Sequence, residues 1–178
     1  MRRIFTFLCL VVALITNAAP KPNLVSTVTN SPSVIELKDQ FELLQKLSFP
    51  TTNLTVLTIA EHKGSEQVAS WVAPLIERYG LRVAINGIAD VSAVPGWLHG
   101  VVRRKFRQRQ SYSVMLDWSG DTVRAFGSVE DCVNVFVLDE RGRILQRFIG
   151  EAKPGSLAEL YATIDQALTK KENPVAKQ

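Results

Sequence analysis

LTVLTIAEHKGSEQVASWVAPLIERYGLRVAINGI, residues 54–88, decides the fold of this chain. Residues 54–60 are β-branched and continuously apolar apart from threonines, a pattern typical of a strand buried on both faces. Residues 66–79 have helical spacing, and Gly80 suits a helix end. The predicted inward side of this helix carries Val68, Val72, Leu75, Ile76 and Tyr79. Residues 81–88 then predict a second core strand.

The alternation of strands and helices continues toward the C-terminus. Pro95-Gly96 opens a predicted helix, and residues 113–118 form a predicted third strand. After a loop that ends at Phe126-Gly127, residues 133–138 and 143–149 predict a hairpin turned at 139–142. Ser156 and Glu159 match a capping box at the start of a closing helix. The predicted apolar sides of the two helices are Trp97, Leu98, Val101, Val102 and Phe106, and Leu157, Leu160, Tyr161, Ile164 and Leu168.

Upstream of residue 54 the pattern is less regular. Residues 20–33 are rich in Pro, Ser, Thr and Asn and predict a flexible lead-in. Residues 34–37 predict a short strand, after which Asp39 is expected to cap a helix with Phe41, Leu43, Leu44 and Leu47 on one side. With a disordered tail over 171–178, this leaves one domain at 34–170. We expect an α/β fold, a three-layer αβα sandwich around a mixed central sheet.

The N-terminus predicts export. Arg2 and Arg3 precede an apolar run over residues 4–15, and small residues follow at Ala18 and Ala19, as in a cleaved signal peptide over 1–19. The run is shorter than the ~20 apolar residues of a spanning helix, so no transmembrane segment is expected after cleavage. Removing the two arginines leaves 19 of 21 basic residues against 17 acidic ones, a net charge of +2. This mild charge argues against nucleic acid as a partner.

Several local sequences resemble the thioredoxin-like superfamily, in particular its TlpA and peroxiredoxin branch. The segment SWVAPLI at 70–76 is similar to the active-site helix with its kinking proline, and 112–127 with 135–150 is similar to the C-terminal half. ADVSAVPG at 89–96 and VFVLDERGR at 135–143 most resemble the YtfJ-type exported proteins, which lack the active-site cysteine pair. The resemblance implies a periplasmic protein.

The same resemblance identifies what this chain lacks. Counting back from Pro74, the two cysteines of the family's C-x-x-C fall on Glu66 and Ala69, and the P-x-x-x-T-x-x-C pattern of peroxiredoxins is missing. The family's cis-proline falls at Cys132 or Val133, so we expect a trans peptide and a reshaped groove. Cys132 is the one thiol left after removal of the signal peptide, which contains Cys9.

Two loops carry the candidate binding residues. The first gives His62, Lys63, Ser65 and Glu66, where backbone N–H groups and Lys63 could bind an anion; the alternative is a solvated loop with Ser65 as a helix cap. The second gives Cys132 and Val133. Cys132 could form a mixed disulfide, but Glu130 and Asp131 are expected to raise its pKa, and a buried cysteine often serves as a small apolar residue.

Other polar groups have simpler interpretations. Arg103, Arg104 and Arg107 could contact an anionic surface, or form the solvated face of their helix. Asp117 and Asp139 end strands and suit turns. His62 and His99 lie too far apart in sequence to suggest a metal site, His99 is expected on the polar side of its helix, and no cofactor motif is found.

Three functional hypotheses follow, and the third is a membrane-surface protein that uses the basic cluster at 103–109. The first is a non-catalytic binding or accessory module of the cell envelope that recognises a protein or peptide. The second is a single-cysteine thiol oxidoreductase or peroxidase that uses Cys132 as its nucleophile.

Overall fold

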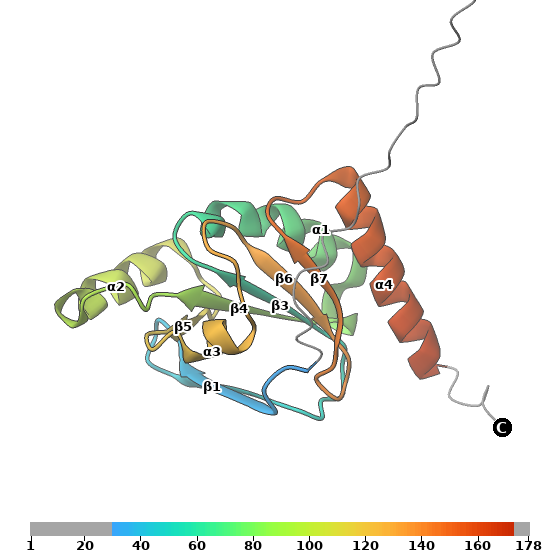
Figure 1. The fold of residues 1–178 in the computed structure, drawn as a ribbon, viewed down its shortest axis with the longest axis horizontal. Helices are drawn as coiled ribbons and strands as arrows, with labels where there is room; N and C mark the ends of the chain where they lie inside the picture. The colour runs from blue at the N-terminus through green and yellow to red at the C-terminus, as the bar shows by residue number, and fades with distance from the viewer. Residues whose placement is uncertain (1–29, 173–178) are drawn as a thin grey trace, which may run out of the picture.

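The computed structural model describes residues 30–172, and the predicted signal peptide and most of the tail lie outside this range. Its centre is a five-stranded sheet in the order β5-β4-β3-β6-β7 (Figure 1). The strand of this sheet that comes first in the sequence, β3 (Thr55–Ala60), is parallel to β4 (Ala84–Asp90), and β4 is parallel to β5 (Met115–Asp117). The hairpin strands β6 (Asn134–Leu138) and β7 (Ile144–Ile149) complete the sheet with antiparallel pairings. The sheet is therefore mixed.

One face of the sheet packs against helices α1 (Val68–Tyr79) and α4 (Pro154–Glu172), which flank the strands in Figure 1. Trp71, Leu75 and Tyr79 of α1 and Leu160 and Ile164 of α4 are buried against β3 and β6. Ile76, which was expected on the inward side of α1, is exposed, whereas Trp71, which was not in the predicted set, is buried. The 3-10 turn η1 (Gly64–Gln67) leads into α1, and η2 (Gly80–Arg82) follows it. The strand predicted from residue 81 begins at Ala84 because η2 occupies its first residues.

Helix α2 (His99–Arg109), preceded by η3 (Gly96–Leu98), packs beside the β4 and β5 end of the same face. Val102 and Phe106 contact the core there, as expected, and Leu98 is half-buried. Trp97 and Val101 are exposed, contrary to the prediction that they face inward. His99 stacks on Trp118 instead of lying on the polar side of the helix.

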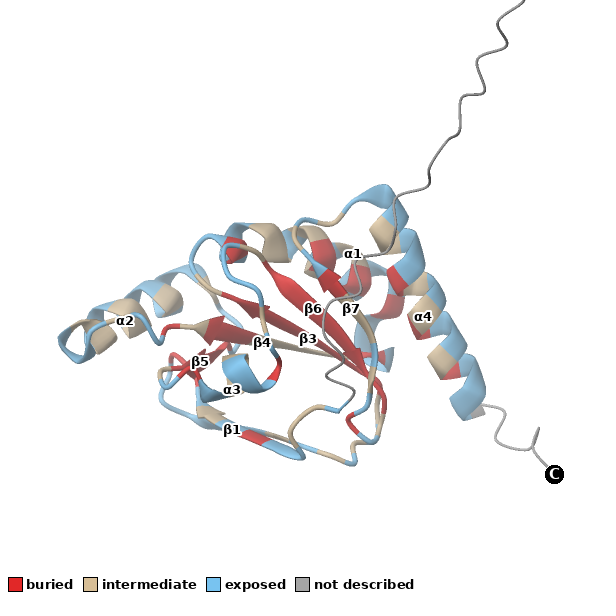
Figure 2. Cartoon of the chain, in the orientation of Figure 1, coloured by how far each residue is buried: buried red, intermediate tan, exposed pale blue. Residues whose placement is uncertain are grey.

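The opposite face is covered by the hairpin β1 (Val34–Lys38) and β2 (Leu44–Ser48) and by α3 (Asp121–Ala125). The prediction of a helix after Asp39 was wrong, because residues 44–48 form β2 and pair with β1 in an antiparallel hairpin. Asp39 accepts hydrogen bonds from the N–H groups of Phe41 and Leu43, so it caps a turn. Glu42 has a φ of 67°, which no regular helix allows. Buried residues concentrate in the central strands (Figure 2).

The two ends of the described range also differ from the prediction. Helix α4 begins at Pro154, so Ser156 lies inside its first turn and bonds Lys153 instead of forming a capping box with Glu159. The helix extends through residue 172, two residues into the predicted tail. At the other end, the N–H of Ser31 in the predicted lead-in donates to the carbonyl of Gly142. No helix within 30–172 is long and apolar enough to cross a membrane.

Candidate functional site

Two segments far apart in sequence meet at the carboxyl edge of β3. They are residues 61–67, which connect β3 to α1, and residues 129–134, which lead into β6; we call them the loop pair. Gly64 is the point of closest approach, because a Cβ atom there would lie 2.4 Å from the carbonyl carbon of Cys132 and 2.8 Å from the nitrogen of Val133. No side chain fits between these backbones. The two segments are therefore in direct backbone contact at this point.

Three polar contacts fasten the loop pair. The Lys63 ammonium donates to Asp131 Oδ1 at 2.9 Å, and the Asp131 N–H donates to Glu61 Oε1 at 2.7 Å. The Val133 N–H donates to Gln67 Oε1 at 3.2 Å. The backbone donors of Asp131 and Val133 are thus satisfied within the chain. The ion pair between Lys63 and Asp131 is exposed and contributes little by itself, so the fastening depends mainly on the hydrogen bonds and the close packing at Gly64.

The first segment is folded by its own backbone. The Ser65 N–H donates to the carbonyl of Glu61, and the Ser65 hydroxyl donates to the carbonyl of His62 at 2.6 Å. Ser65 therefore does not cap α1 with its side chain, as one interpretation of the sequence expected. His62, Lys63, Ser65 and Glu66 are all exposed, so the structure places these four predicted residues together on the surface.

The second segment is ordered by Asn134, a residue that the sequence analysis missed. Its side chain is buried and exchanges two hydrogen bonds with the backbone of Val129, at 2.9 and 2.8 Å. Arg147 on β7 donates to the Asn134 side-chain oxygen at 2.7 Å and to the Gly127 carbonyl. Asp131 has a φ of 62°, in the left-handed region that asparagine and aspartate tolerate best among side-chain-bearing residues. Hydrogen bonds made by the side chains of Asn134 and Arg147 thus fix the turn that carries Cys132.

Cys132 is half-buried beside Val133, which is fully buried. Burial raises the pKa of the Cys132 thiol, and the carboxylates of Asp131 and Glu61 raise it further. The charge of Arg147 and the N–H of Gly150 act in the opposite direction without cancelling the effect. The expectation that Asp131 raises the pKa of the thiol is confirmed, whereas the second carboxylate that does so is Glu61 and not Glu130, which was also expected to. Because the thiolate is the reactive form, this environment disfavours the reactive state of Cys132. Val133 belongs to the core and offers no side chain to a partner.

The structure also tests the positions inferred for the family motifs. Gly64 and Gln67, two residues with C-x-x-C spacing, contact the Cys132–Val133 segment, whereas the proline-based count gave Glu66 and Ala69. Residues 61–69, EHKGSEQVA, contain no cysteine under either count. Val133 directly precedes β6, and its peptide is trans as expected, since Phe49-Pro50 is the one cis bond within residues 30–172.

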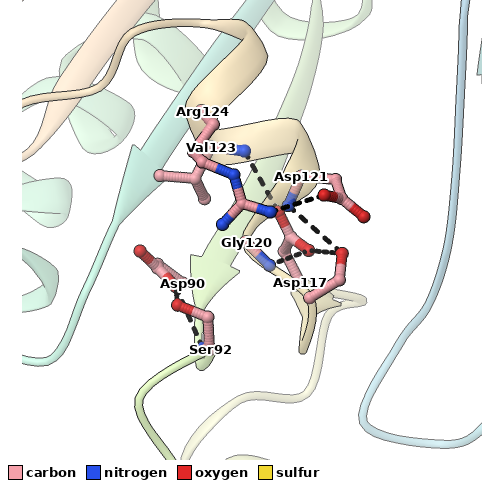
Figure 3. Close-up of polar contacts among 8 residues, drawn as sticks. Asp90, Ser92, Asp117, Gly120, Asp121, Val123 and Arg124 are labelled. Carbon is pink, nitrogen blue, oxygen red and sulfur yellow. Dashed lines mark hydrogen bonds and ion pairs between the residues drawn. The ribbon is translucent and has the colours of Figure 1, made fainter.

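Figure 3 shows the aspartates at the ends of the neighbouring parallel strands β4 and β5. Asp117 is buried and accepts hydrogen bonds from the N–H groups of Gly120 and Val123 and from the Ser119 hydroxyl. Asp90 accepts from the N–H and hydroxyl of Ser92. Both carboxylates therefore shape turns, and Asp117 fixes the start of α3.

Asp139 has the same role in the β6–β7 turn, where it accepts from the N–H groups of Arg141 and Arg143 and from the Arg143 guanidinium. The interpretation of Asp117 and Asp139 as turn-forming residues is confirmed. Within residues 30–172, no three His, Cys, Asp or Glu side chains are grouped so that they could hold a metal ion.

Comparison with known proteins identifies the fold. No protein-family model and no curated protein matches the sequence. Among solved structures, the chain is similar to a protein described as the thiol:disulfide interchange protein DsbE of Chlorobium tepidum, with 19% identity, a TM-score of 0.62, and coverage of 80% of this chain and 99% of that one. It is also similar to the exposed lipoprotein thioredoxin Etrx1 of Streptococcus pneumoniae, with 13% identity, a TM-score of 0.60, and coverage of 75% and 98%.

A third similar structure is the peroxidoxin BcpB of Mycobacterium tuberculosis, with 18% identity, a TM-score of 0.53, and coverage of 78% and 97%. These likenesses confirm the predicted α/β fold: this chain has a thioredoxin-like fold with a mixed central sheet and flanking helices. Proteins with thiol chemistry are among its structural neighbours, whereas its own loop pair carries Cys132 alone.

Proposed function

We propose that this protein is a non-catalytic binding or accessory module of the cell envelope, which uses a thioredoxin-like scaffold to recognise a protein or peptide. The observation that carries the proposal is the fastened loop pair. At the edge of the sheet where its family resemblance implies thiol chemistry, this chain has Gly64 and Gln67 against Cys132 and Val133, with no pair of thiols. Dithiol exchange needs two sulfur atoms within bonding reach of each other, so that reaction has no basis here.

The environment of Cys132 also argues against the alternative function, a single-cysteine thiol oxidoreductase or peroxidase. A nucleophilic thiol in an enzyme has a lowered pKa, whereas burial and two carboxylates raise the pKa of this one. Its sulfur donates only a long hydrogen bond, at 3.5 Å, to the carbonyl of Val129. Titration of the Cys132 thiol with a disulfide reagent should therefore show slow reaction that accelerates only above about pH 8.5. Fast reaction at neutral pH would instead favour an enzyme.

The proposed contact surface consists of the exposed side chains of the loop pair, His62, Lys63, Ser65 and Glu66, together with half-buried Cys132. The fastening contacts support this role because they hold the surface in one conformation. A rigid surface loses little conformational entropy on binding. The resemblance of residues 89–96 and 135–143 to the YtfJ-type proteins and the signal-like residues 1–19 support an envelope location, with the periplasm as the proposed compartment.

Site-specific photocrosslinking tests the proposal. A photoreactive residue at position 66 should capture one partner from an envelope extract. The matched control carries the same residue at Glu159, an exposed glutamate on α4. We expect an adduct at 66 that is absent at 159 and that a second substitution, Lys63→Glu, weakens. The same adducts at both positions, or none at either, would contradict the proposal.

A further inference from the structure

One end of the molecule is formed by α2, which projects at the left of Figure 1, and by the turn of the β1–β2 hairpin, which lies below it in that view. Arg103 of α2 pairs with Glu42 of the turn at 3.6 Å, and the Arg107 guanidinium donates to the carbonyl of Gln40. Gln40 in turn donates to the carbonyl of Tyr112 at 2.7 Å. We call residues 40–44, 97–109 and 112 the α2 end. These contacts join its three segments into one surface.

The α2 end is strongly basic. Helix α2 has the sequence HGVVRRKFRQR, with five lysines and arginines and no acidic residue. The one acidic side chain exposed within the α2 end is Glu42, which is already paired with Arg103. Arg104, Lys105 and Arg109 are exposed and form no ion pair within residues 30–172. The chain as a whole carries only +4, so its positive charge is concentrated here.

The same end exposes apolar and aromatic side chains. Of the twelve large apolar residues exposed in the described range, six belong to it: Phe41, Leu43, Leu44, Trp97, Val101 and Tyr112. Trp97 is 80% exposed, although tryptophan is usually well buried. Figure 2 shows no buried residue on α2. Trp97 in η3 and Val101 and Arg104 in α2 are all exposed, so apolar and basic side chains occur together along this segment.

We propose that the α2 end binds the surface of a membrane containing anionic phospholipids. Trp and Tyr partition to the boundary between headgroups and acyl chains, and arginine and lysine are attracted to anionic headgroups. A helix with a lysine- and arginine-rich face and exposed Trp, Phe or Leu side chains suits binding in the plane of such a surface. The exposed apolar residues favour a membrane over a purely polar acidic partner. This inference stands independently of the proposed function, because it rests on the residues of the α2 end and not on those of the loop pair.

Vesicle binding tests the proposal. The sheet and its cores lie within residues 30–172, so a chain that begins at residue 20 contains the whole described fold and avoids the apolar segment 4–15. We expect it to sediment with vesicles of phosphatidylglycerol in phosphatidylcholine at low salt, and not with phosphatidylcholine alone. High salt should release it, because screening weakens surface charges. The fluorescence of Trp97 should shift to the blue, and Trp97→Ala should remove that shift.

Two charge-reversal variants make the test specific. Arg104→Glu with Lys105→Glu should weaken binding at least about thirty-fold, since each cation near an anionic surface contributes about 1 kcal/mol. The control, Arg141→Glu with Lys153→Glu, changes the net charge equally at exposed positions outside the α2 end and should weaken binding about two-fold or less. An equal loss in both variants, or binding to polyglutamate but not to anionic vesicles, would overturn the proposal.

Discussion

Gly64→Ala tests whether the loop pair is as tightly packed as the structure implies. The new Cβ would lie 2.4 Å from the carbonyl carbon and 2.5 Å from the carbonyl oxygen of Cys132. These are backbone atoms, so no side-chain rotation can relieve the overlap. The turn that carries them is held by Asn134 and by the hydrogen bond from Val133 to Gln67. Overpacking in such a site typically costs 1–3 kcal/mol, and we expect the upper part of this range, about 2–3 kcal/mol.

Thermal and urea unfolding of the two chains measure the effect. For a domain of this size, a loss of 2–3 kcal/mol lowers the melting temperature by about 4–12 °C. The matched control is Gly100→Ala in α2, where a Cβ meets nothing within 4 Å. It should be neutral or stabilising by up to about 1 kcal/mol, because alanine is a better helix former than glycine. A cost below about 0.5 kcal/mol for Gly64→Ala, the range of ordinary surface changes, would refute the close contact within the loop pair.

Two further predictions concern pH. Burial opposes ionisation of Asp139, but hydrogen bonds from Arg143 and Arg141 hold the pKa of this carboxyl below the usual value. The ionised Asp139 therefore stabilises the fold above about pH 4, and this stabilisation is lost as the pH falls through the lowered pKa. Asp139→Asn should cost about 1–3 kcal/mol at neutral pH and flatten the acid limb of a stability–pH curve; an unchanged acid limb would exclude this role. Burial and the hydrogen bond to Asp165 raise the pKa of Tyr79 to about 12, so its stabilisation is complete below about pH 10 and decreases as the pH rises toward 12. Ultraviolet titration should show a tyrosine step near pH 12, and Tyr79→Phe should remove that step; a titration curve that this substitution leaves unchanged would contradict it.

The parts of the fold that follow repeating patterns could be predicted from the sequence. The continuous apolar run at 55–60 and the turn residues at 139–142 indicate their elements without reference to the rest of the chain. The hairpin at 34–48 could not be identified, because Asp39 begins turns as readily as helices and its partner strand decides between them. Helix α3 has five residues, too few to show a periodicity, and it depends on hydrogen bonds to Asp117.

The candidate site was predicted in part. The sequence and its family resemblance identified both loops, and Cys132 within one of them. The fastening could not be seen, because Gly64 and Cys132 are 68 residues apart and the contact is made by backbone atoms. A signal was present in Gly64 itself, since a glycine in the loop before a helix often marks close backbone approach.

At α4, Pro154 was the better start signal than Ser156, since proline is favoured at the first helical position.

The reduction of insulin disulfides is the measurement that most directly tests the proposal that this protein does not catalyse thiol–disulfide exchange. With dithiothreitol as the reductant, the protein and its Cys132→Ser variant should give the same rate as dithiothreitol alone, because the loop pair has no second thiol and the raised pKa of Cys132 disfavours the thiolate that this exchange needs. Multiple turnovers above that background, lost in the Cys132→Ser variant, would establish the single-cysteine enzyme in place of the binding module.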